Sequence, residues 1–293
     1  MKELIITILK IVAPLCVTFV VFAQGLQISP SQVMVYFKER PWLILRSLVA
    51  VLVLVPLAAL GIILLLDPAR EVAIGLAILV ACPPAPMMIK ATPKLGKGSA
   101  AYMASLHLSL AVLALVTVPA VLYLMSIPLG FHAEVDLLTM TWILLRTILI
   151  PICGGLAVRV FFPGFADKYG PMFDKAGGIG LLVVIVLASV KLFPLMLQVR
   201  SWSYLVIVAV CVTGLAIGHW FGSSDPHHRT TLAVESAIRH PALALTIGVM
   251  NFTPEKALPV LVPCVLVFIV VAVVYLVGRK KSAAAGEPAG SVA

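Results

Sequence analysis

The chain alternates between long apolar runs and short polar stretches. A helix that crosses the hydrocarbon core of a bilayer needs about 20 mostly apolar residues. Nine runs approach or exceed this length: 4–26, 41–66, 71–93, 98–126, 137–161, 178–197, 202–222, 229–250 and 257–278. No convincing cleavage site follows the first run, so we expect a membrane helix there and not a signal peptide. The pattern predicts an all-α polytopic membrane protein with about nine helices.

Composition agrees with this prediction. Of the 293 residues, 62% are hydrophobic and 11% are charged, whereas a soluble protein carries roughly 25% charged residues. The net charge of +9 does not indicate nucleic-acid binding, because the basic residues gather in alternate loops and near the C-terminus. By the positive-inside rule, the N-terminus lies outside and the C-terminus in the cytoplasm of a multi-pass cell (inner or plasma) membrane protein. We expect the tail, residues 282–293, to be disordered.

Two of the apolar runs are interrupted. The third contains Pro83, Pro84 and Pro86, and the eighth contains Pro241 after a charged stretch. Proline removes a backbone donor, and the freed backbone groups can exist in a membrane only where they face protein, water or a ligand. Interruptions at corresponding places in two oppositely oriented halves are typical of inverted-repeat transporters. The sequence therefore predicts a binding site where the two broken helices meet.

The eighth run supplies three candidate site residues. Glu235 and Arg239 are four apart, so a continuous helix would place both on one face. The two residues then either form a structural ion pair or belong to the transport site. Both are possible if Arg239 pairs with Glu235 in one state and binds a substrate carboxylate in another. His240 is either a proton acceptor or a neutral residue that donates to a carbonyl at the break.

Further candidates lie elsewhere in the chain. His107, on the helix after the first break, is either functional or satisfied by a backbone carbonyl. Lys90 either points into the first break or extends to the membrane surface. We expect the adjacent His227 and His228 to be solvated in a loop. The five cysteines have no CxxC spacing and predict small buried hydrophobes. No hydrolase or nucleotide-binding motif occurs, so we do not expect an enzyme.

Four segments resemble the bile acid:sodium symporter family. The two specific ones are Ala81 to Pro84 followed by Lys97-Gly98, which resembles a Cys-Pro-Gly-Gly…Lys-Gly motif, and Glu235 to Ala244, which resembles Glu-x-Gly-x-Gln-Asn-x-x-Leu-Ala. The others are Phe22 to Ile28 and Arg40-Pro41-Trp42 with Pro56. The resemblance covers about residues 11 to 278 and implies the nine-helix form. It implies a core of residues 41–126 and 202–278, a panel of residues 4–26 and 137–197, and substrate between them.

The chain departs from the family pattern at the residues that hold sodium. The places of a Ser-Asn pair are taken by Met88 and Ile89, or by Ile89 and Lys90 in the other register, while Arg239 and His240 replace Gln and Asn. A hard cation prefers oxygen ligands, so only Glu235 remains as a ligand if a sodium site survives. We therefore expect a secondary transporter of a small organic anion that is sodium-independent or proton-coupled and needs no cofactor. The alternatives are a sodium-coupled symporter with a degenerate site, and a non-transporting receptor or partner on the same fold.

Overall fold

The computed structural model describes residues 2–85, 88–96, 98–131, 137–197, 201–251 and 254–285. Within these ranges the chain is helical apart from short connections, and it contains one isolated β-bridge and no strand. Long apolar runs cannot leave backbone groups unpaired in lipid, and a helix pairs them within its own segment. The predicted all-α architecture is confirmed.

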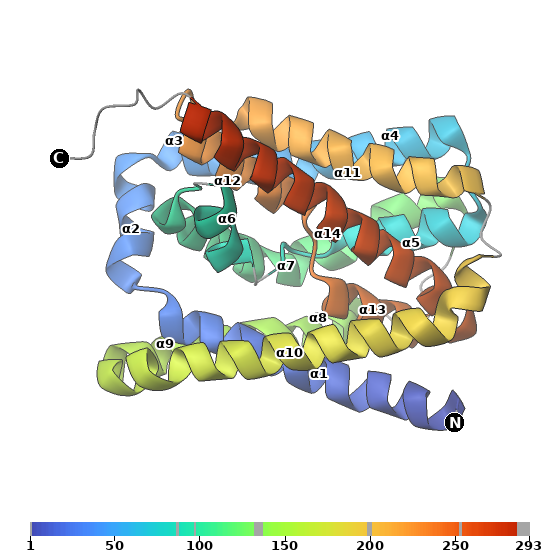
Figure 1. The fold of residues 1–293 in the computed structure, drawn as a ribbon, viewed down its shortest axis with the longest axis horizontal. Coiled ribbons are helices and arrows are strands. Elements are labelled where there is room, and N and C mark those ends of the chain that lie inside the picture. Colours follow the sequence, from blue (N-terminus) through green and yellow to red (C-terminus); the bar gives the residue numbers. More distant parts are fainter. Residues whose placement is uncertain are drawn as a thin grey trace.

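The helices follow the predicted runs in order. They are α1 (Lys2–Gln27), α2 (Pro30–Glu39), α3 (Pro41–Val49), η1 (Ala50–Leu54), α4 (Val55–Leu66), α5 (Arg70–Ala81), α6 (Met88–Gly96), α7 (Ala100–Leu129), α8 (Leu137–Leu144), η2 (Leu145–Leu149), α9 (Ile150–Phe161), α10 (Pro163–Met196), α11 (Ser201–Phe221), α12 (Pro226–Ala237), α13 (Pro241–Asn251) and α14 (Pro254–Ala285). The long helices lie roughly along one axis, and α2 runs across them at one end (Figure 1). The start of α1 and the end of α14 lie at opposite ends of that axis.

Six helices in the described part of the chain are long and apolar enough to cross a membrane. They cover residues 41–66, 100–129, 138–161, 163–187, 201–221 and 261–281. The three remaining predicted runs fall on α1 and on the two interrupted helices, α5 with α6 and α12 with α13. The polytopic membrane fold is therefore established, while the count of nine stays a prediction.

The start of the sixth helix was predicted wrongly. The sixth apolar run of the sequence begins at residue 178, but α10 begins at Pro163. Proline suits a first helical turn because its fixed φ is already helical and no intrahelical partner is lost there. The charged residues in this first part of α10 lie mostly at exposed positions, so they do not interrupt the helix. The charged residues between 163 and 178 therefore do not mark the N-terminal end of α10.

The helices pack in two groups. α1 lies along α9 and α10, and a Cβ atom added to Gly155 would come within 2.2 Å of the carbonyl oxygen of Phe22 on α1, so this contact needs glycine. The other helices, α3 to α7 and α11 to α14, contact one another, with α11 packed most closely on α12. The two groups meet where α10 contacts α14 and α1 contacts α13. They also meet where α8, which leads through η2 into α9, contacts α7. A boundary between two helix groups therefore runs beside α13.

Candidate functional site at the crossing of two broken helices

The first break follows α5. The helix ends at Ala81, Cys82 adopts an extended conformation (φ −64°, ψ 148°), and α6 begins at Met88. Pro83 and Pro84 lie in between and are buried. Because neither proline has an N–H, the helix cannot continue through them, and the carbonyls at the end of α5 are left without partners from their own helix. Pro86 lies outside the described residues.

The second break separates α12 from α13. α12 ends at Ala237, Ile238 is extended, and α13 begins with Pro241 at its first position. The residue before a proline is disfavoured in the helical conformation, which accounts for a break at His240. His240 then caps α13, because its Nδ1 accepts a hydrogen bond of 3.3 Å from the N–H of Leu243. An accepting Nδ1 fixes the neutral tautomer with the proton on Nε2.

The two breaks cross and pair through their backbones. Pro84 and Arg239 form an antiparallel bridge. The N–H of Ala85 donates to the carbonyl of Ile238 at 3.1 Å, and the N–H of His240 donates to the carbonyl of Pro83 at 2.8 Å. Both bonds join residues on either side of the bridged pair, so Pro84 and Arg239 form a pair without hydrogen bonds of its own. The bridge therefore does not need the N–H that Pro84 lacks. Deep within the protein, the crossing therefore satisfies backbone groups that the two breaks left without partners in a helix.

Arg239 places a guanidinium at this crossing. Its Nη1 donates to the carbonyl of Cys82 and its Nη2 to the carbonyl of Val51, both at 3.3 Å. The residue is 4% exposed. Cys82 directly follows the last residue of α5, so the cation lies at the negative end of a half-helix dipole. The crossing thus carries a fixed, buried positive charge.

Glu235 does not pair with Arg239, and the expected shared helix face is wrong. α12 ends between them, so the four-residue spacing no longer places them together. The Oε1 of Glu235 instead lies 3.3 Å from Nδ1 of His107 on α7. Both side chains are buried, Glu235 completely. The structure brings His107 and Glu235 together, a pairing between residues 128 positions apart that the sequence did not indicate.

Several buried polar atoms around the breaks have no protein partner. Among the described residues these include Oε2 of Glu235, Oγ of Ser236, Nε2 of His240 and Oγ1 of Thr92. Buried polar atoms are almost always bonded to protein, water or a ligand. Sequence reasoning missed Ser236 and Thr92, because their short side chains drew less attention than the charged residues near them, Glu235 and Lys90. The side chain of Lys90, the remaining predicted site residue, lies outside the described residues.

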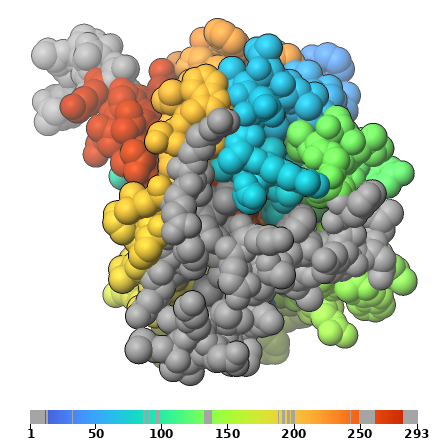
Figure 2. Space-filling model, turned by 90° about the vertical axis from the view of Figure 1, so that its right-hand side faces the viewer, coloured from blue at the N-terminus to red at the C-terminus, as the bar shows by residue number. Residues whose placement is uncertain are grey.

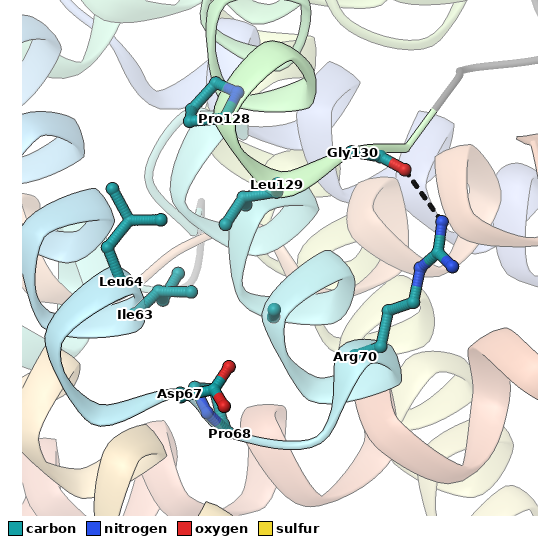
Figure 3. Close-up of a pocket in the computed structure, with 9 residues that line it drawn as sticks. Ile63, Leu64, Asp67, Pro68, Arg70, Pro128, Leu129 and Gly130 are labelled. Atoms are coloured by element: carbon teal, nitrogen blue, oxygen red, sulfur yellow. Dashed lines mark hydrogen bonds between the residues drawn. The ribbon is translucent and has the colours of Figure 1, made fainter.

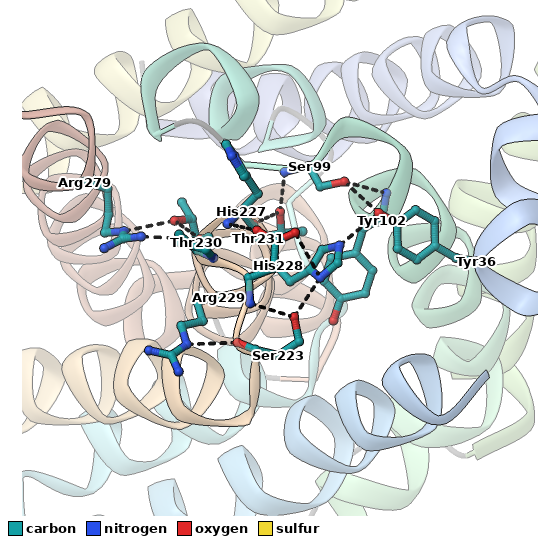
Figure 4. Close-up of polar contacts among 12 residues, drawn as sticks. Tyr36, Ser99, Tyr102, Ser223, His227, His228, Arg229, Thr230, Thr231 and Arg279 are labelled. Atoms are coloured by element: carbon teal, nitrogen blue, oxygen red, sulfur yellow. Dashed lines mark hydrogen bonds and ion pairs between the residues drawn. The ribbon is translucent and has the colours of Figure 1, made fainter. Parts of the chain in front are cut away.

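A second polar cluster lies where α12 begins (Figure 4). His228 is buried, with Nε2 3.0 Å from the Tyr36 hydroxyl of α2 and Nδ1 2.8 Å from the Ser223 hydroxyl. The expected solvation of His228 is therefore wrong, whereas His227 is exposed. Burial lowers the pKa of His228 below its ordinary value, although Asp225 opposes this shift. This cluster joins α2 to α12 and to the loop that precedes α12.

An open cavity of about 480 Å³ lies at the other end of the molecule (Figure 3). It is bordered by the turn between α4 and α5 and by the end of α7, which lie side by side in Figure 2. Arg70 donates across its edge to the carbonyl of Gly130 at 2.7 Å. None of the predicted site residues lines it. The buried charges therefore lie at the crossing and not in this cavity.

Comparison with known proteins shows the family of this chain. The model described as the sodium bile acid symporter family matches residues 14–199, more than half of the chain. This region contains the first break, and the second lies beyond it. A relative from Bacillus subtilis (strain 168), an uncharacterized sodium-dependent transporter called YocS, is 24% identical over 250 residues, covering 82% of this chain and 74% of the relative. The predicted family resemblance is confirmed.

Proposed function

Because the chain belongs to the sodium bile acid symporter family, whose members are transporters and not enzymes, we propose that it moves a small organic anion across a membrane by alternating access without using sodium. The observation that carries this proposal is the guanidinium of Arg239, buried at the crossing on two backbone carbonyls. Among the residues that the structure describes, Arg239 forms no ion pair with a carboxylate.

A buried cation without a carboxylate partner suits an anionic substrate. Removing a charge from water is costly unless other charges or dipoles compensate. The carbonyls compensate in part, and a substrate carboxylate would complete the pairing bidentately. The half-helices α6 and α13 begin just after the two breaks. Their N-termini add positive potential near the crossing. In the family's sodium-using members a bound sodium ion supplies positive charge to the site. In this chain the guanidinium of Arg239 would supply that charge permanently.

The substrate would bind between the two helix groups. We propose that α1 and α8 to α10 form a panel and that α3 to α7 and α11 to α14 form a core, with α13 at the boundary beside α1. Rocking of the core against the panel would expose the crossing to each side in turn. The buried pair of Glu235 and His107 would be the group that carries a proton, if transport is coupled to one. The N-terminus would lie outside and the C-terminus in the cytoplasm.

Sodium coupling is the second candidate function. The name of the Bacillus subtilis relative favours it, and Oε2 of Glu235, buried and without a protein partner, is a carboxylate oxygen of the kind that a hard cation binds. A non-transporting receptor on the same fold is the third. The sodium response distinguishes the first two, and substrate uptake distinguishes both from the third.

The test of sodium dependence is the thermal stability of the purified protein as sodium replaces choline at constant ionic strength, at two pH values. A ligand that binds only the folded state raises stability by RT ln(1 + [L]/Kd). We expect no sodium-specific rise in the unmodified protein. We expect Arg239→Gln to gain a saturable, sodium-specific rise, because the variant vacates the position of the cation. A saturable rise in the unmodified protein would overturn sodium independence.

The test of transport is uptake of labelled organic anions, including a bile acid and a keto acid, into proteoliposomes. We expect Arg239→Gln to abolish uptake of the transported anion while the protein remains folded. Arg279→Gln is a matched control, since Arg279 contacts Thr230 and the carbonyl of Pro226 near the end of α14, away from the crossing. Normal uptake by a well-folded Arg239→Gln variant would rule out this site. Loss of uptake in both variants would point to a general structural effect.

A further inference from the structure

The carbonyl of Val51, which accepts from Arg239, belongs to an irregular turn. α3, η1 and α4 form one continuous helix, and η1 (Ala50–Leu54) is a π-helical turn in which the N–H of residue i+5 donates to the carbonyl of residue i. The N–H of Val55 donates to the carbonyl of Ala50. The next residue, Pro56, has no N–H. The carbonyl of Val51 is therefore left without a donor from its own helix.

The guanidinium of Arg239 supplies the missing donor. Val51 is 1% exposed and Pro56 is buried, so bulk water does not reach this carbonyl. A buried carbonyl without a partner destabilises the fold, and the bond from Nη2 of Arg239 removes that penalty. Val51, Pro56, Cys82 and Arg239 also line one small cavity, which places the proline beside the contact that it permits.

We propose that Pro56 is a positioning residue for Arg239. By withholding an N–H from the carbonyl of Val51, Pro56 reserves that carbonyl for the guanidinium and holds the positive charge at the crossing of the two broken helices. Pro56 contributes no group that would contact the substrate. This inference rests on the proposed function only in treating Arg239 as the cation of the transport site.

The chain contains a matched control for this arrangement. η2 (Leu145–Leu149) is a second π-helical turn, in which the N–H of Ile150 donates to the carbonyl of Leu145, and Pro151 follows directly. Its pattern is the same as that of η1 followed by Val55 and Pro56. Neither hydrogen bond of Arg239 reaches this second turn. The change in Tm on Pro151→Ala therefore measures the effect of restoring an N–H after a π turn at a place that Arg239 does not contact.

The test is a double-mutant cycle on the full-length purified protein, measured by thermal unfolding. With Arg239 present, we expect Pro56→Ala to lower Tm, because the new N–H competes for the carbonyl of Val51 and weakens its 3.3 Å hydrogen bond with the guanidinium. In an Arg239→Met background the same substitution should raise Tm, because the new N–H then satisfies a carbonyl that has lost its donor. Double-mutant cycles isolate such dependence of one residue on another.

A reversal of sign between the two backgrounds supports the proposal, and Pro151→Ala should change Tm in the same direction in both. If Pro56→Ala also changes Tm equally in both backgrounds, Pro56 does not act through Arg239 and the proposal is wrong. Arg239→Gln serves as a second background if Arg239→Met does not fold, since its shorter side chain cannot reach both carbonyls. The cycle does not measure transport or sodium binding, so failure of the proposed function and failure of this inference remain distinguishable.

Discussion

Nδ1 of His107 and Oε1 of Glu235 lie 3.3 Å apart in the interior of the protein, and Oε2 of the same carboxylate has no protein partner. α7 and α12 supply the two residues, and α12 ends two residues after Glu235. The carboxylate therefore depends on a single described side-chain contact in a place where an unpaired charge is costly. This dependence makes the pair sensitive to substitution.

His107→Leu should lower the free energy of unfolding by about 1.5–3 kcal/mol, because it removes the hydrogen-bond partner of the buried Glu235 side chain. Thermal or denaturant unfolding of the purified protein measures this loss. His219→Leu is the control, since His219 makes a partly buried hydrogen bond of 2.9 Å with the neutral hydroxyl of Tyr275, and such a bond contributes about 0.5–1.5 kcal/mol. Equal losses in the two variants would show that Glu235 does not depend on His107.

Gly218→Ala should destabilise the packing of α11 on α12. A Cβ atom at Gly218 would come within 2.4 Å of the carbonyl oxygen of Leu232 and 2.6 Å of Oγ of Ser236. α12 must then move away, and overpacking of this kind costs about 1–3 kcal/mol. Gly178→Ala on α10 meets nothing within 4 Å and should stabilise its helix by about 0.5–1 kcal/mol. Melting temperatures of the two variants should therefore shift in opposite directions.

His240→Ala should remove the cap of α13, whereas His240→Asn should keep it. The Nδ1 of His240 accepts from the N–H of Leu243, and loss of such a cap costs about 1 kcal/mol. Asparagine is among the best capping residues, so its variant should unfold close to the unmodified protein. The comparison of the two unfolding free energies provides the measurement. If asparagine fails to rescue, a role of His240 other than capping dominates stability.

Lowering the pH through the ordinary imidazole pKa of about 6.5 should destabilise the protein partly through His228. Burial lowers the pKa of His228 in the folded protein, so below that ordinary value the unfolded chain binds a proton that the folded chain does not. The contribution to stability is complete above this pH and is lost as the pH falls. His228→Gln should therefore flatten the decrease of Tm between pH 7 and pH 5. His227→Gln, at the exposed neighbour, should leave it unchanged.

The sequence by itself determined the membrane class, the helix order and the two interruptions. Apolar runs of bilayer length and prolines inside two of them require these features, because lipid cannot satisfy free backbone groups. The sequence also identified Glu235, Arg239, His240 and His107 as candidates, because polar side chains in such runs need a reason to be there. It misplaced the start of α10, where charged residues at exposed positions are part of the helix.

Only the tertiary structure decided which of these residues meet. Glu235 pairs with His107 and not with Arg239, because the break ends α12 between the two charges. Arg239 joins the carbonyls of Val51 and Cys82, which lie 188 and 157 positions away in the chain. The sequence shows that prolines free backbone carbonyls, since that follows from covalent structure. Which donor satisfies each one depends on how helices cross, and that is set by the packing of the whole chain.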